Sequence, residues 1–169
     1  MARLEAGSKA PAFTLPDAHS AKVSLKDFAG RAVVVYFYPA DDTPGCTKEA
    51  CQFNDNLRAF DRADVAVLGI SPDGAEKHTK FIGKFKLRFP LLSDPTHAVM
   101  EKYGAWGEKT LYGKKTVGVI RSTFLIDGKG GSRGRGTRSA QTATPPRSSR
   151  RLRRSTEAQG CERRACASW

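Results

Sequence analysis

Two cysteines, Cys46 and Cys51, have the residue type and the surroundings needed for nucleophilic chemistry. Cys46 follows Thr43-Pro44-Gly45, a pattern that predicts the start of a helix with Thr43 as its N-cap. A helix N-terminus offers unpaired N–H groups and a partial positive charge, and both stabilise a thiolate, the reactive form of cysteine. In a compartment that keeps thiols reduced, a C-x4-C pair indicates a catalytic or metal-binding pair. The sequence therefore predicts a reactive thiol at Cys46.

The spacing of Cys46 and Cys51 predicts a disulfide that forms only for part of a reaction cycle. In an unbroken helix, five steps of about 1.5 Å place the two Cα atoms about 8 Å apart. A disulfide requires Cα atoms closer than about 7 Å. The two sulfurs can therefore join only if the first turn of the helix unwinds, which indicates a working disulfide. The alternative is a pair of buried, inert cysteines.

Strands and helices that alternate along the chain predict an α/β fold, with a sheet between helices. A run of β-branched and aromatic residues, residues 32–38, predicts a strand buried on both faces that ends at Pro39. Cys46 then lies just beyond the carboxyl end of a strand, where ligands bind in open α/β sheets. The other predicted elements are helices over 46–60, 75–85 and from Asp94 or Thr96 to about Tyr103, a strand over 65–70, and one or two strands over 117–126.

The segment around Cys46 resembles the active site of peroxiredoxins, in particular the bacterioferritin comigratory protein, or peroxiredoxin Q, subgroup. The resemblance is carried by Tyr36-Phe37-Tyr38-Pro39 and by Thr43-Pro44-Gly45-Cys46-Thr47-Lys48-Glu49-Ala50-Cys51. Pro39, Thr43 and Cys46 fit the P-x-x-x-T-x-x-C pattern of that family. Residues 10–15 and 118–127 are similar as well, so the resemblance covers residues 4–128.

This resemblance implies a thioredoxin-like fold and the reduction of hydrogen peroxide or organic hydroperoxides without a metal or organic cofactor. It makes Cys46 the peroxidatic cysteine and Cys51 the resolving cysteine. Thr43 would hydrogen-bond the thiolate and the peroxide, Pro39 would shield the pocket from water, and Arg121 would stabilise the thiolate and the leaving oxygen. Thioredoxin or a similar dithiol would reduce the disulfide, and the protein would be a monomer or a weak dimer.

The last quarter of the chain differs from the rest in composition. Residues 129–169 carry 11 Lys and Arg against 2 Asp and Glu, and contain no Val, Ile, Phe, Met or Tyr. Such a segment cannot bury enough apolar surface to offset its ordering entropy. We therefore predict a peroxiredoxin-like domain over 1–128 that lacks its last strand and helix, followed by a disordered Arg-rich tail over 129–169.

The tail has the character of translation in a wrong reading frame. With G/C-rich codons chosen for residues 132–155, a reading one nucleotide out of phase gives VERAWYKVRADGHAAKVVAALAA and then a stop. This alternative text has a strand-like segment followed by an amphipathic helical one. An evolved basic arm that binds polyanions is the competing interpretation, but no aromatic residue lies between the arginines to stack on bases.

Two other functions compete with a peroxidase. A disulfide reductase is disfavoured because the cysteines are not in a C-x-x-C arrangement, and an inactive remnant with a polyanion-binding tail is the second alternative. No apolar stretch is long enough to cross a bilayer, and residues 1–11 contain no secretory signal, so we expect a cytoplasmic protein without a membrane or a specific nucleic-acid partner.

Several polar and aromatic residues have simpler expected roles. Scattered histidines are most often surface residues, and acidic residues in a turn most often shape it. The residues concerned are the histidines His19, His78 and His97 at the surface, the turn residues Asp41 and Asp42, and Trp106 and Tyr112 in a loop near the pocket.

Overall fold

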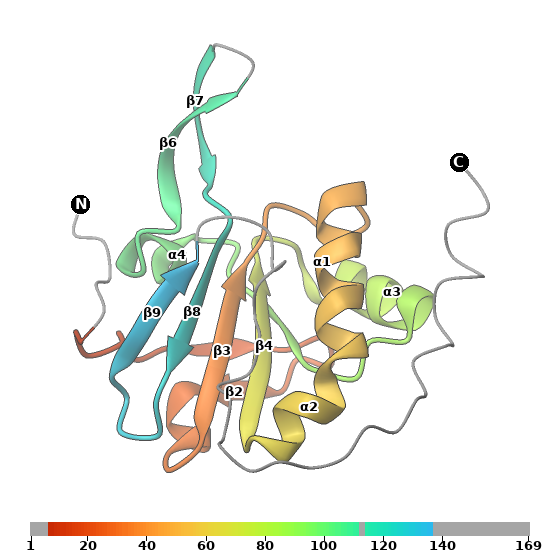
Figure 1. Ribbon diagram of the computed structural model, residues 1–169. Helices are drawn as coiled ribbons and strands as arrows, with labels where there is room; N and C mark the ends of the chain where they lie inside the picture. The colour runs from red at the N-terminus through yellow and green to blue at the C-terminus, as the bar shows by residue number, and fades with distance from the viewer. Residues whose placement is uncertain (1–6, 112–113, 137–169) are drawn as a thin grey trace, which may run out of the picture.

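The computed structural model describes residues 7–111 and 114–136, and its centre is a five-stranded mixed sheet (Figure 1). The strand order is β5-β4-β3-β8-β9. Strands β3, β4 and β5 are parallel, whereas β8 runs antiparallel to β3 and β9 antiparallel to β8. The bounds are β3 Ala32–Phe37, β4 Val65–Ser71, β5 Leu91–Ser93, β8 Ser122–Ile126 and β9 Ser132–Gly136.

Helices cover the two faces of the sheet because the side chains of β3 alternate between two apolar cores. Val34 and Tyr36 belong to the core under the helices α1 Pro44–Asp55, α2 Leu57–Arg62 and α3 Ala75–Phe85, which lie together on one side in Figure 1. Val33, Val35 and Phe37 belong to the opposite core. That core also takes in residues of β1 Thr14–Pro16 and α4 Ala98–Lys102, with residues of β2 Lys22–Ser24 and the short 3-10 helix Leu25–Phe28 packed against it. The predicted α/β fold with a sheet between helices is confirmed.

The helices agree with the sequence pattern in place but differ in length. The predicted helix over 75–85 is confirmed as α3. The single helix expected over 46–60 is wrong, because the helix ends and restarts at Asn56, whose Nδ2 donates to the carbonyl of Gln52 at 2.8 Å. The third helix, α4, is shorter than the segment expected from Asp94 or Thr96 to Tyr103.

A hairpin stands away from the sheet in Figure 1 where a loop was expected. Its strands are β6 Trp106–Leu111 and β7 Lys114–Val119, paired antiparallel. Trp106 therefore begins a strand, which corrects the expected loop, while Tyr112 lies outside the described residues. The predicted segment 117–126 thus contains the end of β7 and all of β8, and the connection between them carries Arg121.

Strand β9 corrects the predicted boundary at residue 128. Ser132–Gly136 pairs with β8, so the sheet gains a strand where the sequence predicted disorder, and β8 has a partner on both sides. Backbone pairing requires no apolar side chain, and the N-terminal segment adds to it, since Ser132 N–H donates to the carbonyl of Ser8 at 2.9 Å. Residues 137–169, the rest of the predicted tail, lie outside the described residues.

Candidate active site

Cys46 lies in the first turn of α1, at the carboxyl end of β3, as the sequence predicts. Thr43 has the extended backbone of an N-cap, and Pro44 begins the helix. The first i to i−4 hydrogen bond runs from Thr47 N–H to the Thr43 carbonyl at 2.8 Å, so the amides before it point out of the helix end. The Cys46 side chain is buried, with 2% of its surface exposed. A helix N-terminus stabilises a nearby thiolate, so this position favours a reactive cysteine.

Arg121 brings a positive charge to the sulfur from just before the start of β8, which pairs with the carboxyl end of β3. Its Nη2 donates to Cys46 Sγ at 3.0 Å, and its Nη1 forms an ion pair with Glu49 Oε2, one turn further along α1. Burial lowers the pKa of Arg121, but the charges of Glu49 and Cys46 together raise it by more than burial lowers it. The net shift of the pKa is upward, so the guanidinium stays charged. The fixed cation favours the thiolate over the thiol.

Glu49 holds the guanidinium in place at a cost to itself. Its side chain is 2% exposed, and burial raises the pKa of this carboxyl from 4.5, an effect that the Arg121 charge opposes. Its second oxygen, Oε1, is buried without a hydrogen-bond partner among the described residues. Glu49 therefore depends on Arg121 for its charged state, and the pair is best treated as one unit with Cys46.

Tyr36 fixes the body of α1 over the sheet. Its ring stacks on Phe53 of α1 with centroids 4.7 Å apart and on Tyr38 with centroids 5.3 Å apart. Burial is the first cause that raises the pKa of Tyr36 well above its usual range, and the nearby charges of Glu49 and Asp41 add to it. The lack of a side chain at Gly69 on β4 leaves room for the ring, since a Cβ there would lie 2.8 Å from the Tyr36 hydroxyl. Tyr36 is thus a neutral, rigid support beneath the active-site helix.

Two of the predicted site residues, Pro39 and Thr43, lie in the loop before α1. Pro39 is half-buried. Thr43 Oγ1 donates to the Ala40 carbonyl at 3.3 Å and does not cap the helix with its side chain. Both residues are close to Cys46 in sequence. Their expected roles, Pro39 in shielding the pocket from water and Thr43 in hydrogen-bonding the thiolate and the peroxide, remain predictions.

Cys51 lies within α1, which is continuous from Pro44 to Asp55. Cys46 and Cys51 are both thiols, the first buried and the second half-buried. In this helix five residues separate their Cα atoms by about 8 Å, beyond the reach of a disulfide. A Cys46–Cys51 disulfide therefore remains a prediction that requires the start of α1 to unwind.

The surface position expected for His78 is wrong, and the turn role expected for Asp41 is confirmed but incomplete. His78 was expected at the surface but is fully buried, and Asp41 is more than a turn former, since its carboxylate lies 2.7 Å from His78 Nδ1 and is 3% exposed. The sequence contained a signal for this, because His78 shares a helix face with Phe81 and Phe85 at spacings of three and seven. His19 is exposed as expected, and the half-buried His97 stacks on Trp106 with centroids 3.7 Å apart.

Other site types find no support in the part of the chain that the structure describes. Residues 7–111 and 114–136 contain no cluster of three or more His, Cys, Asp or Glu side chains that could hold a metal ion. Within the same residues, none of the helices has the length and apolar character to span a bilayer.

Comparison with known proteins gives one consistent result. The AhpC/TSA family pattern matches residues 6–131. A peroxiredoxin of Mycobacterium tuberculosis is 59% identical over 128 residues, which cover 76% of this chain and 82% of the relative. Peroxiredoxin Bcp of Escherichia coli is 50% identical over 127 residues, which cover 75% and 81%.

Solved structures agree. Peroxiredoxin Q of Xanthomonas campestris superposes with a TM-score of 0.71 and 37% identity, covering 76% of this chain and 82% of that one. A further structure of the Xanthomonas campestris bacterioferritin comigratory protein, at 36% identity, a TM-score of 0.71 and coverage of 76% and 83%, concerns alkyl peroxide reduction.

Proposed function

The chain belongs to the AhpC/TSA family and is a thiol peroxidase, and we propose that Cys46 is the cysteine that attacks the peroxide. The observation that carries this proposal is the 3.0 Å contact between Arg121 Nη2 and the buried Cys46 Sγ at the start of α1. The thioredoxin-like fold of the protein positions this thiol beyond the carboxyl ends of the parallel strands. A half-buried cation beside a buried thiol at a helix N-terminus favours a nucleophilic thiolate.

In the first step, the Cys46 thiolate attacks the terminal oxygen of the hydroperoxide along the O–O bond. The S–O bond forms as the O–O bond breaks, and the two electrons of the sulfur reduce the peroxide. Cys46 becomes a sulfenic acid, and the other oxygen leaves as water or an alcohol after taking up a proton. Donors already in place, Arg121 Nη2 and the free N–H groups of the first turn, stabilise the charge that develops on the leaving oxygen.

In the second step, Cys51 attacks the sulfur of the Cys46 sulfenic acid, and water leaves as the disulfide forms. The distance of about 8 Å across an intact helix means that the first turn of α1 unwinds before this step. Unwinding also removes Cys46 from Arg121, so the sulfenic acid is attacked outside the site that formed it.

In the third step, an external dithiol reduces the disulfide by exchange and is itself oxidised. We assign this role to thioredoxin or a similar dithiol protein. The substrates are hydrogen peroxide and organic hydroperoxides, in keeping with the alkyl peroxide reduction studied in the Xanthomonas campestris relative. We propose a cytoplasmic monomer or weak dimer in which no cofactor is needed.

A Cys46→Ser variant tests the assignment. It should lose peroxide turnover completely while keeping the wild-type circular dichroism and unfolding temperature, since serine is close in size to cysteine. Substantial turnover by the purified variant would reject Cys46 as the nucleophile. Peptide mapping after one equivalent of peroxide should show a Cys46–Cys51 link within one chain, and links only between chains, or a stable sulfenic acid, would reject Cys51 as its partner.

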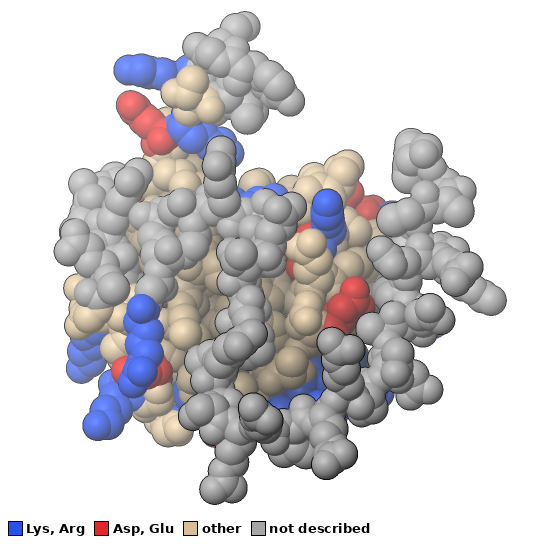
Figure 2. Space-filling model, in the orientation of Figure 1, with Lys and Arg blue, Asp and Glu red and all other residues tan. Residues whose placement is uncertain are grey.

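The competing function of a polyanion binder has less support. On the face shown in Figure 2, the described Lys and Arg side chains are spread among acidic ones and do not form one basic patch. The Arg-rich residues 137–169, on which that function would depend, lie outside the described residues.

A further inference from the structure

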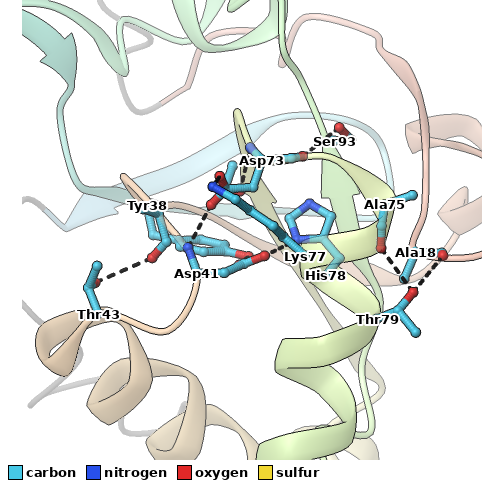
Figure 3. Close-up of polar contacts among 12 residues, drawn as sticks. Ala18, Tyr38, Asp41, Thr43, Asp73, Ala75, Lys77, His78, Thr79 and Ser93 are labelled. Carbon is cyan, nitrogen blue, oxygen red and sulfur yellow. Dashed lines mark hydrogen bonds and ion pairs between the residues drawn. The ribbon is translucent and has the colours of Figure 1, made fainter.

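A buried polar cluster, formed by Tyr38, Asp41 and His78, ties the loop before Cys46 to helix α3 (Figure 3). The Tyr38 hydroxyl donates to Asp41 Oδ1 at 2.7 Å, and Asp41 Oδ2 lies 2.7 Å from His78 Nδ1. An ionised carboxylate can only accept hydrogen bonds, so the proton of this contact belongs to Nδ1. Burial, followed by the charges of Tyr36 and Asp41, raises the pKa of Tyr38 well above its usual range, which keeps its hydroxyl a donor.

The same cluster reaches the segment after β4. The backbone N–H of Asp41 donates to Asp73 Oδ2 at 2.7 Å, and Asp73 is held in turn by Lys77 Nζ at 2.8 Å and by Ser93 Oγ, which donates to its carbonyl at 2.6 Å. Figure 3 shows Asp41 between Tyr38, His78 and Asp73. One residue of the loop thus receives hydrogen bonds on both carboxylate oxygens and donates one from its backbone.

The loop needs such support because its backbone is strained. Asp42, between Asp41 and the N-cap Thr43, has φ of 57°, a left-handed conformation that non-glycine residues seldom adopt. A strained residue persists only where its surroundings fix it, and such residues gather at active sites. The Asp42 carboxylate also pairs with Lys84 of α3 at 2.7 Å, but both side chains are more than half exposed, so this pair holds the loop weakly.

Burying the polar ring of His78 under the loop costs free energy of desolvation. Its side chain is fully buried, and its Nε2 has no hydrogen-bond partner among the described residues. An apolar side chain would avoid that desolvation cost. Among the described residues, the polar contact of the ring that can compensate for this cost is the contact with Asp41, which indicates that the histidine supports the loop.

We propose that Asp41 and His78 are positioning residues that hold the loop before Cys46 in the conformation that reacts with peroxide, and so set how readily α1 unwinds for the disulfide step. This proposal rests on the proposed role of Cys46. The cluster stabilises the folded site only, since unwinding the start of α1 frees the loop that carries Asp41. Weakening the cluster therefore has opposite effects on the two steps, slowing the peroxide reaction and speeding disulfide formation.

His78→Leu and His78→Asn form the matched test. Leucine has a similar size but no donor, whereas the Asn amide nitrogen occupies nearly the position of Nδ1 and can still donate to Asp41. Stopped-flow kinetics would give the rate constant for Cys46 with hydrogen peroxide and, separately, the rate of disulfide formation. Intact mass at high peroxide would give the fraction of Cys46 oxidised to sulfinic acid, which competes with the disulfide.

For His78→Leu we expect the peroxide rate constant to fall about tenfold, disulfide formation to speed up about tenfold and the sulfinic fraction to drop, as the loss of a buried hydrogen bond to a charged group implies. His78→Asn should stay within about threefold of the wild type. Tyr38→Phe, which keeps the ring and removes only the hydroxyl donor, should follow His78→Leu in direction and provides the test if that variant does not fold. Lys84→Ala, the control that breaks only the exposed pair, should change neither rate by more than about twofold.

The proposal is overturned if both rates fall together, if Asn behaves as Leu does, or if Lys84→Ala has the same effect as His78→Leu. These failures are distinct from a failure of the proposed function, which would show itself as turnover in Cys46→Ser.

Discussion

Replacing Arg121 with alanine removes the cation 3.0 Å from Cys46 Sγ and, in the same change, the ion-pair partner of the buried Glu49. The chemical loss is large, because one preorganised donor aimed at developing charge contributes about 10²–10³-fold to a rate. The structural loss is large as well. Breaking a buried ion pair costs about 3–5 kcal/mol, and since 26% of the Arg121 side chain is exposed we expect the lower end, about 3 kcal/mol.

The structural loss has a pH dependence of definite sign. Burial already raises the pKa of Glu49 from 4.5, and removing the opposing Arg121 charge raises it further. The folded variant then keeps a proton at pH values where the unfolded chain has lost it. Its stability therefore falls as the pH rises from 4.5 through the raised pKa, so the deficit against the wild type should be smallest near pH 4.5 and should grow as the pH rises through the raised pKa.

A second substitution, Glu49→Gln, separates the two losses. In Arg121→Ala/Glu49→Gln the unpaired charge is gone. Urea unfolding should therefore show that most of the lost stability is recovered and that the pH dependence of the stability deficit has disappeared. The stopped-flow rate constant with hydrogen peroxide should stay about 100-fold below the wild type. Excess peroxide should still produce the Cys46–Cys51 disulfide. If the rate constant recovers together with the stability, Arg121 acts only through packing and its assigned role at the sulfur is wrong.

Further predictions concern the scaffold around the site. Gly69→Ala should destabilise the fold by about 1–3 kcal/mol, because the new Cβ would lie 2.6 Å from Leu91 Cδ2 and 2.8 Å from the Tyr36 hydroxyl. Gly83→Ala, in open space on α3, should instead stabilise by about 0.5–1 kcal/mol, and urea unfolding of both variants checks the contrast. Ser132→Val should stabilise the fold by about 1–2 kcal/mol and so raise the unfolding temperature. The reason is that Ser132 is 2% exposed and its hydroxyl is buried without a partner among the described residues. The alternative reading frame begins with Val at this position, so restoring that frame over 132–155 should raise the unfolding temperature further, and no gain by calorimetry would reject the out-of-frame origin of the tail.

The main elements of the fold could be predicted because their burial leaves a local pattern, which is a continuous apolar run in β3 and helical spacing of apolar residues in α3. The apolar run 32–38 and the spacing of Phe81 and Phe85 correctly predicted β3 and α3. The break at Asn56 could not be predicted in the same way, since Phe53, Leu57 and Phe60 keep helical spacing across it. Strand β9 was missed for the opposite reason: its Ser, Arg and Gly residues have no strand pattern, and pairing with β8 supplies the backbone hydrogen bonds that order it.

The site residues also differ in whether local sequence or tertiary contacts bring them together. Cys46 could be found from the residues beside it, because a helix start is a local feature, and Arg121, 75 residues away, could be placed there only through the family resemblance. The contact between Asp41 and His78 joins residues 37 apart and leaves no local trace beyond the helix face that His78 shares with Phe81. A polar residue on an apolar face has two physical outcomes: it makes a surface gap in the face, or it is buried with a partner from another element. Here the second outcome holds, because the turn before α1 supplies Asp41 as the partner of His78. Asp42 at positive φ and the hydrogen bond from Asp41 N–H to Asp73 fix that turn only once the sheet and α3 have assembled.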